Sequence, residues 1–354
     1  MPTPGLEQIL DYARRHGLSS APEAHITLLS RSFDSALYSI AEAKDAADYV
    51  ILKYFAPDQT DLARREAEGL RVCGAVGLAP ELLSFDDIGA TVGGPIVAYR
   101  EPRSRSLGDT RLTDDHVRQW SFLLLTLHHL SAAKVQHNSI LSATLTQWWE
   151  RLQPLWNETR AAYSDPAYAP LIEGLTQLRS YVDVHVQANK DLWVNVPRRP
   201  CHGDPIPVNL MDTGERLLLT DWGGFGLGDI AMEIARAAAL AALNEEISSE
   251  QYVHLMNDYI AGASDLKDST LEQRVHIYAS VFPFGFTLFM LTFLARIQSD
   301  GPETTLVEDP AVYRGRGLMA VARSLVWIQD ALGLQVVAPN EALAPFGQIT
   351  IARS

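Results

Sequence analysis

Two carboxylates and one amide occur close together in the second half of the chain. Asp204 and Asn209 are separated by four residues, and Asp221 follows the short apolar run Leu217–Thr220. Phosphoryl transfer needs a carboxylate that orients the attacking hydroxyl and oxygen ligands for metal ions that neutralise phosphate charge. An Asp and an Asn with this separation can lie on one tight loop, and a following strand can return a second carboxylate to the same place. The pattern therefore favours phosphoryl transfer.

These residues lie in two strings that resemble known motifs. Residues 202–209 resemble the H-G-D-x-x-x-x-N motif of the aminoglycoside phosphotransferase and choline kinase superfamily, and residues 220–222 resemble its I-D-W metal-binding turn. The resemblance implies that Asp204 orients the substrate hydroxyl in catalysis. It also implies that Asn209 and Asp221 hold two Mg²⁺ ions.

Two further residues are implied to support the catalytic loop. By resemblance, His202 orients the loop through hydrogen bonds and does not act as an acid or base. Gly228–Ala231 resembles the family's G-D-x-A segment, whose acidic residue, here Asp229, supports the same loop. His128 and His129, at the end of an apolar helix, are interpreted as core or rim residues because no ligand-spaced His or Cys partner lies nearby.

The first hundred residues carry the other half of the resemblance. Val50–Lys53 resembles the strand that bears the family's phosphate-binding lysine, and the helix containing Glu66 resembles the helix whose glutamate pairs with it. Glu68 competes for that pairing, and Glu66 is preferred because its spacing to Leu70 and Cys73 matches the family's helix. The implied site binds the phosphates of ATP or GTP near Lys53.

The nucleotide contacts depart from the family in one place. The loop between the first two strands is usually rich in glycine, so that backbone amides can approach phosphates, but Ser30–Ser35 contains none. The hydroxyls of Ser32 and Ser35 are the candidate phosphate contacts, and Tyr99 and Glu101 at the hinge are the candidate base contacts. The departure leaves open whether the nucleotide is ATP or GTP. It also keeps a catalytically silent, kinase-like binding protein as an alternative.

The elements that position these residues are strands first and helices afterwards. Alternating apolar runs from residue 24 to residue 55 predict an antiparallel meander, followed by a helix over Asp61–Val76 and strands at Glu81–Phe85 and Pro95–Tyr99. Gly77 is the predicted C-terminal signal of that helix. After residue 101 the pattern is helical, beginning with Asp114–Leu130.

A chain of 354 residues exceeds the size of a typical single core, so two lobes are expected. The predicted fold is α+β and bilobal, resembling protein kinases, with a nucleotide-binding lobe over residues 1–101 and a helical lobe over 102–354. The helical lobe would contain the catalytic loop at 200–210, the metal-binding turn at 219–223 and a substrate-binding insert at about 138–195.

Composition limits the partners and the compartment. The net charge of −14 and the lack of a basic patch argue against a nucleic-acid partner. Two cysteines, Cys73 and Cys201, do not form a disulfide framework, and Met1–Ser20 lacks the apolar core of a signal peptide, so a cytoplasmic protein is expected. Ile277–Ala295 is apolar enough to suggest a membrane span, but Pro283 and its polar residues favour a buried helix. We expect a monomer or homodimer with no membrane partner.

The phosphoryl acceptor is the part of the predicted reaction that the sequence defines least. Glu245, Glu246 and Glu250 could attract an amine-bearing molecule such as an aminoglycoside, whereas the tryptophans of the insert and Phe282–Phe293 could line an apolar pocket. An aminoglycoside or another amine-bearing or natural-product acceptor is placed first, and a macrolide, choline or a hydroxy amino acid remain alternatives. A protein kinase is disfavoured because Asp221–Gly223 replaces the D-F-G turn and no A-P-E segment follows.

Overall fold

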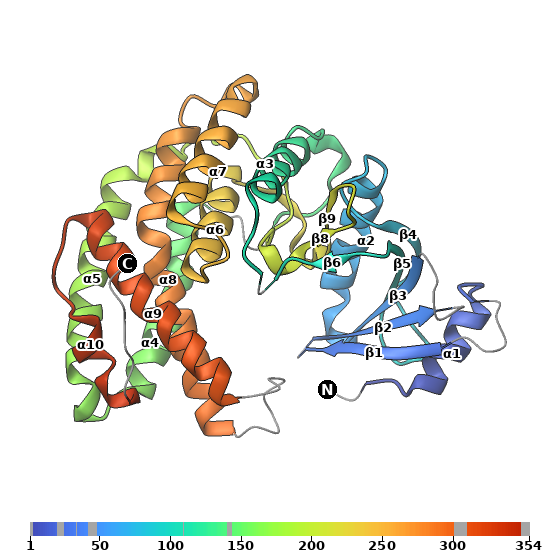
Figure 1. The fold of residues 1–354 in the computed structure, drawn as a ribbon, viewed down its shortest axis with the longest axis horizontal. Helices are drawn as coiled ribbons and strands as arrows, with labels where there is room; N and C mark the ends of the chain where they lie inside the picture. Colours follow the sequence, from blue (N-terminus) through green and yellow to red (C-terminus); the bar gives the residue numbers. More distant parts are fainter. Residues whose placement is uncertain are drawn as a thin grey trace. The chain divides into compact units, whose positions relative to one another are not determined.

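The computed structural model describes residues 3–19, 25–32, 34–41, 48–108, 110–139, 144–300 and 310–347. The chain divides into two compact units (Figure 1). Unit 1 comprises Met1–Ser142, Arg198–Glu233 and Val253–Leu266, and unit 2 comprises Ala143–Pro197, Ile234–Tyr252 and Lys267–Ser354. The lobe boundary after residue 101 stays a prediction, since unit 1 joins the predicted small lobe to the catalytic-loop segment.

Unit 1 contains an antiparallel sheet of five strands in the order β1-β2-β3-β5-β4. The strands are β1 His25–Arg31, β2 Ser35–Ala41, β3 Asp48–Phe55, β4 Glu81–Asp86 and β5 Ile96–Pro102. Successive strand side chains point to opposite faces, and in β2 the buried positions alternate, with Ala36, Tyr38 and Ile40 in the core. The predicted meander and the α+β organisation are confirmed.

The N-terminal helix α1, Leu6–Arg15, was not predicted. Its buried residues Ile9, Tyr12 and Ala13 have the i, i+3, i+4 spacing of one helix face, and they share an apolar cluster with Tyr38 and Leu52 of the sheet. The helix therefore covers one face of the sheet, and its burial depends on contacts with strands far along the chain.

Helix α2, Thr60–Gly74, follows β3 after the 3₁₀ turn η1, Pro57–Gln59. Its buried side chains include Ala63, Leu70 and Cys73. The predicted helix had nearly the same bounds, and Gly77 has the expected left-handed backbone (φ 76°), three residues after the last helical residue.

Short strands frame the catalytic loop of unit 1. The antiparallel order β6-β8-β9 joins Arg105–Ser106, Leu210–Asp212 and Leu217–Leu219, and β7 Arg199–Cys201 pairs with β10 Gly226–Gly228. Residues 202–209 therefore lie between β7 and β8, with Asp221 two residues after β9. Helix α3, Asp114–His128, packs against β7 and β9.

Unit 2 is helical in its described residues. Its helices are α4 Leu145–Ala162, α5 Ala169–Asn189, α8 Leu271–Asp300, α9 Pro310–Leu332 and α10 Pro339–Ala342. Helix α6, Ile230–Leu243, begins in unit 1 and continues in unit 2, whereas α7, Ser249–Gly262, begins in unit 2 and continues in unit 1. The remaining 3₁₀ turns are η2 Ala132–Lys134, η3 Pro166–Tyr168, η4 Lys190–Trp193, η5 Pro207–Asn209, η6 Trp222–Gly224, η7 Ser264–Leu266 and η8 Ala344–Phe346.

Two sequence features of unit 2 belong to its core. Within α8, Leu271–Ile297 is long and apolar enough to cross a membrane, but 78% of its most apolar window is buried inside the structure, as in the core helix of a soluble protein. Trp148, Trp149 and Trp156, which were considered for a substrate pocket, are also buried, and Trp149 Nε1 donates to Asp183 Oδ1 at 2.8 Å. These tryptophans therefore stabilise helix packing.

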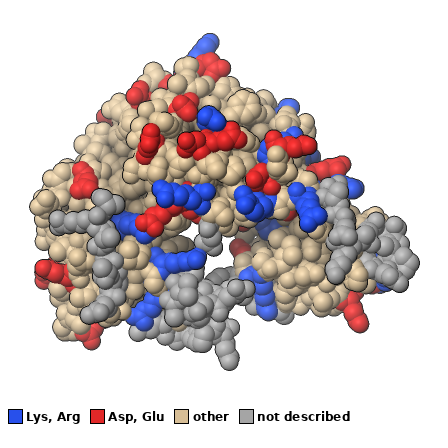
Figure 2. Space-filling view, viewed as in Figure 1, with Lys and Arg blue, Asp and Glu red and all other residues tan. Residues whose placement is uncertain are grey.

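Charged side chains of both signs are interspersed on the face seen in Figure 2, and most of the described surface there is uncharged. The excess of acidic residues therefore does not form one continuous acidic field on that face.

Candidate active site

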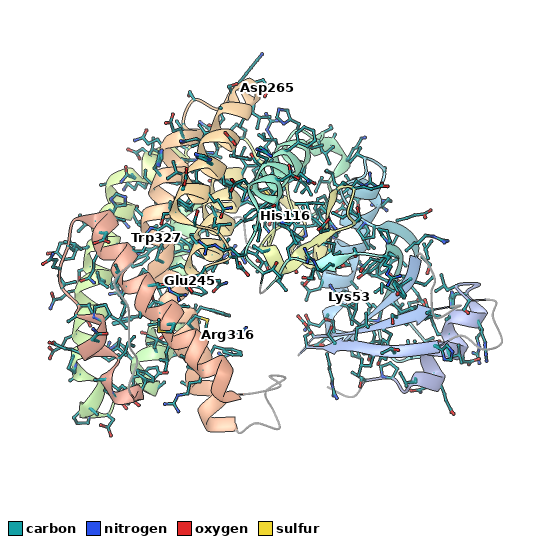
Figure 3. All side chains as sticks on the ribbon, viewed as in Figure 1. Lys53, His116, Glu245, Asp265, Arg316 and Trp327 are labelled. Carbon is teal, nitrogen blue, oxygen red and sulfur yellow. The ribbon has the colours of Figure 1, made fainter. Side chains whose placement is uncertain are left out.

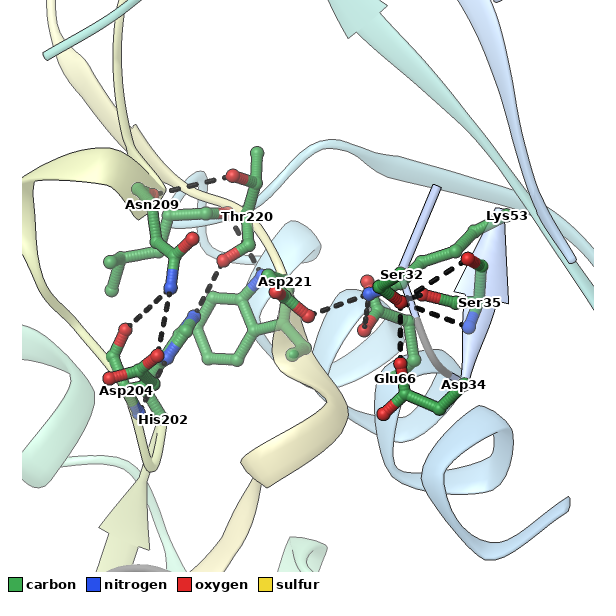
Figure 4. Close-up of polar contacts among 12 residues, drawn as sticks. Ser32, Asp34, Ser35, Lys53, Glu66, His202, Asp204, Asn209, Thr220 and Asp221 are labelled. Carbon is green, nitrogen blue, oxygen red and sulfur yellow. Dashed lines mark hydrogen bonds and ion pairs between the residues drawn. The ribbon is translucent and has the colours of Figure 1, made fainter. Parts of the chain in front are cut away.

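A buried lysine joins two carboxylates of unit 1. Lys53 on β3, labelled in Figure 3, alternates with the core residues Leu52 and Tyr54, so its side chain takes the other face of the sheet. Its Nζ lies 2.8 Å from Glu66 Oε2 on α2 and 2.6 Å from Asp221 Oδ1 (Figure 4). The lysine is therefore paired with Glu66, and not with Glu68.

The charges of this cluster depend on one another. Burial alone lowers the pKa of Lys53, but Asp221 and Glu66 together raise it above its ordinary value. Lys53 lowers the pKa of Asp221, whereas burial raises the pKa of Glu66 despite the same lysine. One cation between two carboxylates leaves a formal excess of one negative charge when all three are ionised, which favours a further cation.

The catalytic loop begins with a histidine whose ring makes two hydrogen bonds. His202 Nε2 lies 2.9 Å from the oxygen of Thr220, and Asp204 N donates to His202 Nδ1 at 3.2 Å. Burial lowers the pKa of His202, which agrees with a neutral ring that donates from Nε2 and accepts at Nδ1. The histidine therefore orients the loop.

Gly203 occupies a position that has no room for a side chain. Its φ is 94°, and a Cβ atom there would lie 2.6 Å from the oxygen of Gly224. This close approach brings the catalytic loop against the turn that follows Asp221.

Asn209 closes the loop onto Asp204. Its Nδ2 donates to the backbone oxygen of Asp204 at 2.8 Å and lies 3.5 Å from Asp204 Oδ2, while Thr220 N donates to Asn209 O at 3.0 Å. Because the amide nitrogen faces Asp204, the side-chain oxygen of Asn209 is the atom that can face a metal.

Asp221 has a left-handed backbone, with φ 63° and ψ 64°. Asp tolerates this conformation better than most residues, and such outliers are common at functional sites. The next residue, Trp222, is buried and packs on α2, where a Cβ added at Gly69 would lie 2.7 Å from Trp222 Cβ. The turn is thus set directly against the helix that carries Glu66.

A residue that the sequence reasoning missed supports the catalytic loop. Glu233 on α6 is buried, and its carboxylate accepts hydrogen bonds from His202 N at 3.0 Å and Gly203 N at 2.6 Å. His128 Nε2 lies 2.9 Å from the same carboxylate. Burial alone raises the pKa of Glu233, but the hydrogen bond from His128 contributes most to lowering it below its ordinary value.

Asp229, to which loop support was assigned, accepts a hydrogen bond from Ala231 N at 3.0 Å, at the start of α6. Glu233 accepts hydrogen bonds from two of the loop's amides, and the support assigned to Asp229 stays a prediction. A lone acid among the apolar residues of α6 is the sequence signal that could have revealed it, because a buried charge needs partners.

The β1–β2 turn is held by its own hydroxyls. Ser32 Oγ donates to Asp34 Oδ1 at 2.6 Å, accepts from Ser35 N at 3.0 Å and lies 2.9 Å from Ser35 Oγ. Phe33 lies outside the described residues. The two serines predicted to contact phosphate are therefore bonded to each other.

The predicted base contacts lie on β5. Tyr99 is buried, and burial raises the pKa of its hydroxyl above the ordinary range. Burial also raises the pKa of Glu101, whose carboxylate lies 3.5 Å from Ser104 Oγ. The strand register places Tyr99 opposite Ile51 and Glu101 opposite Tyr49.

The donor set suits magnesium. Asp221 and Asn209 offer only oxygen ligands toward a metal, and Mg²⁺ binds through one or two carboxylates together with substrate phosphates. The side chain of Asp221 is 58% exposed despite its bond to Lys53, so ligands can reach it. These residues therefore fit the predicted metal.

A second group of metal-ligand types is buried in unit 1. The ligand atoms of His128, Cys201 and Glu233 lie within 4.8 Å of one another. His128 and Glu233 are already hydrogen-bonded to each other, and Glu233 also binds two loop amides, so this group supports the catalytic loop.

The predicted acceptor residues lie in unit 2. Glu245, labelled in Figure 3, forms an ion pair with Arg323 at 2.8 Å. Phe282 is buried, whereas Phe289 is 51% exposed. The Glu245 pairing weakens the expectation that its charge attracts an amine.

Together, the lysine–glutamate pair on a sheet and helix, the Asp-x₄-Asn loop and the returning Asp221 define a protein-kinase-like phosphotransferase fold. Residues 25–268 match the model of the phosphotransferase enzyme family, and the chain belongs to that family. The resemblance inferred from the sequence and the predicted fold class are both confirmed.

One curated relative and two solved structures illustrate the likeness. Protein LicA of Haemophilus influenzae is 34% identical over 76 residues, which is 21% of this chain and 21% of LicA, so the match spans about a fifth of that relative. The GDP complex of aminoglycoside 2′-phosphotransferase-IIIa has a TM-score of 0.58 and 14% identity, covering 91% of this chain and 98% of that one. A choline/ethanolamine kinase family protein from Mesorhizobium loti has a TM-score of 0.52 and 19% identity, covering 91% and 99%. At these identities the structures show the shared fold.

Proposed function

We propose that the protein is a nucleotide-dependent phosphotransferase that moves the γ-phosphoryl group of ATP or GTP to a hydroxyl of a small molecule. One observation carries the proposal: Lys53 is bonded to both Glu66 and Asp221, and Asp221 follows the loop on which Asp204 and Asn209 are bonded together. This set supplies a phosphate-binding cation, metal ligands and a carboxylate for the hydroxyl.

Each residue has a distinct role in this proposal. Lys53 binds the nucleotide phosphates, and Glu66 holds the lysine in place. Asn209 and Asp221 would hold Mg²⁺, which neutralises charge on the phosphates when bound. Asp204 accepts a hydrogen bond from the attacking hydroxyl and points it at the phosphorus, so that its contribution is mainly position and charge. His202 and Glu233 keep the loop in the required conformation.

The nucleotide co-substrate is supported by the family and by the fold shared with a GDP complex. The proposed phosphate contacts do not distinguish ATP from GTP, because Lys53, Asn209 and Asp221 contact no base in this scheme. The base would lie near Tyr99 and Glu101 on β5. Comparing turnover with ATP and with GTP tests which of the two nucleotides the protein uses.

We propose an amine-bearing alcohol as the acceptor class. An aminoglycoside phosphotransferase and a choline/ethanolamine kinase family protein share this fold, and the molecules in both names carry a hydroxyl together with a cationic nitrogen. This nitrogen is an amine in aminoglycosides and ethanolamine and a quaternary ammonium in choline, and both kinds are included in the proposed class. The net charge of −14 favours a cationic substrate through long-range attraction. The proposal covers amino sugars and amino alcohols equally.

The test is nucleotide consumption by the purified protein with Mg²⁺ and ATP or GTP. The acceptors are aminoglycosides, choline, ethanolamine, a macrolide and a hydroxy amino acid. We expect turnover only with an amine-bearing alcohol, with loss of that turnover in Asp204→Asn. Turnover with a nitrogen-free alcohol such as glycerol, added as a control, and with none of the nitrogen-bearing acceptors would reject the acceptor class. No acceptor-dependent turnover with either nucleotide would reject the function.

A further inference from the structure

Helix α2 carries a second buried acid, Glu68, which the proposed chemistry does not use. Its side chain is 2% exposed. Glu68 Oε1 accepts a hydrogen bond from Gln136 N at 2.7 Å, and Glu68 Oε2 lies 2.5 Å from His137 Nδ1. Both carboxylate oxygens are therefore bonded to the segment Gln136–Asn138, which follows η2.

The same segment is bonded to the chain that follows Asp221. Leu227 N donates to His137 O at 2.8 Å, and Ser139 N donates to Leu227 O at 2.9 Å. Ser139 Oγ donates to Gly224 O at 3.1 Å. The segment and the next residue, Ser139, therefore connect α2 with β10 and η6 by hydrogen bonds.

Arg65, next to Glu66 in the sequence, adds a second connection. The side chain of Arg65 is only 12% exposed. Its guanidinium pairs with Asp61 and donates to the backbone oxygen of Asn138. The same Nη1 lies 3.4 Å from Phe225 O. Arg65 and Glu68 are three residues apart, so both project from neighbouring turns of the helix toward Gln136–Asn138.

These contacts tie together the two elements that share Lys53. Glu66 reaches the lysine from α2, and Asp221 reaches it from the turn before η6. Because the relative position of Glu66 and Asp221 fixes the lysine ammonium, a change in the position of α2 would move the phosphate-binding group. Catalysis is sensitive to displacements of this kind.

We propose that Glu68 and the segment Gln136–Asn138 form a clasp that holds α2 against η6 and so positions Lys53, Glu66 and Asp221. Glu68 is a positioning residue, since it acts on the reacting groups through α2. The inference rests on the proposed function. It adds Glu68 as a residue whose carboxylate holds the site in position and does not contact the reacting groups.

The test compares Glu68→Ala with Arg64→Ala, an exposed residue of the same helix that pairs with Asp87. Two readouts are needed: steady-state turnover, and hydrogen exchange of the α2 amides against those of β2 and β3. For Glu68→Ala we expect kcat to fall by about tenfold or more, because small displacements of reacting groups are costly. Exchange in α2 should accelerate while β2 and β3 are unchanged, since local opening exposes only the released element. Arg64→Ala should stay within about twofold of the wild type.

A second pair of variants covers the case in which Glu68→Ala does not fold. His137 is 23% exposed, so His137→Ala removes one bond of the clasp with less burial at risk. We expect its kcat to fall by about threefold, with His137→Gln restoring the wild-type value because glutamine keeps a donor for Glu68. An unchanged kcat in His137→Ala, or unchanged α2 exchange in a folded Glu68→Ala, would overturn the proposal. If the wild type transfers no phosphoryl group, the proposed function fails, whereas the exchange data still decide whether Glu68 holds α2.

Discussion

The catalytic loop, residues 202–209, and the β1–β2 turn, residues 32–35, are both short polar connections of unit 1, but they are supported differently. The loop is bonded to groups outside it, above all Glu233 and the backbone oxygen of Thr220. In the turn, the hydrogen bonds that the described residues give to Ser32 stay within the turn. The backbone of the turn is also bonded to the residue that follows β3, because Ala56 N donates to Asp34 O at 2.8 Å, but its hydroxyl bonds are local. Loss of the Glu233 support should therefore act on the whole loop, whereas loss of the Ser32 hydroxyl should have a mainly local effect.

The largest expected effect comes from removing the catalytic charge without removing the loop's support. Asp204→Asn should lower kcat by about 10² to 10⁴-fold, the usual contribution of a positioned proton acceptor. Nucleotide binding and the unfolding midpoint should stay near those of the wild type, because Asn209 is bonded mainly to the backbone oxygen of Asp204. Steady-state kinetics and calorimetry check both parts. Normal turnover in the variant would remove Asp204 from the mechanism.

The next effect tests the external support. Glu233→Gln replaces a buried carboxylate that accepts hydrogen bonds from two loop amides with an amide that cannot satisfy them all. We expect the free energy of unfolding to fall by about 3 kcal/mol, together with a loss of turnover. Glu245→Gln, at a side chain that is 70% exposed, is the matched control and should leave stability unchanged. Equal stability of the two variants in denaturant unfolding would contradict the role given to Glu233.

A pH effect follows from the loop's histidine. Burial lowers the pKa of His202 in the folded protein below its ordinary 6.5, so the unfolded chain binds a proton that the folded chain does not. Stability should therefore decrease as the pH falls below about 6.5, by at most about 1.4 kcal/mol per pH unit from this group. His202→Gln should reduce that slope, and the exposed His276→Gln should not. Identical slopes in denaturant unfolding of the wild type and His202→Gln would refute this assignment.

The smallest effect is expected in the β1–β2 turn. Ser32→Ala removes a hydroxyl that donates to Asp34 and accepts from Ser35 N, which should cost about 1 kcal/mol of stability. Turnover should change by no more than about threefold, because the change is confined to the turn. The control Ser30→Ala, on the exposed strand β1, should change neither stability nor turnover. Thermal unfolding and kinetics are the measurements. A loss of turnover comparable to that of Asp204→Asn would show that the hydroxyl contacts the nucleotide phosphates.

The contrast also explains what could be predicted from sequence. The strands could be predicted from apolar alternation, and the catalytic loop from the spacing of its residues together with its resemblance to the family's motif. The Lys53–Glu66 pairing was implied by the resemblance alone. The structure joins Lys53 to Asp221, residues far apart in the chain, through the strand that returns after the loop.

Helix α1, the loop support by Glu233 and the bonds of Glu68 were not predicted. Each depends on contacts between segments distant in the sequence, which a local pattern does not specify. Glu68 was weighed only as a partner of Lys53, yet the helix turns its carboxylate to residues 136 and 137. Resemblance to the family's helix distinguished Glu66 from Glu68, but it did not reveal the partners of Glu68.

The most direct test of the central claim is calorimetric titration of ATP and GTP into the protein with and without Mg²⁺, for the wild type and Asp221→Asn. Lys53 and Asp221 form a site for phosphate and metal in this account, so the wild type should bind at least one nucleotide more tightly with Mg²⁺ present. Asp221→Asn should lose that dependence on metal. Metal-independent binding in the wild type, or unchanged metal dependence in the variant, would contradict the account.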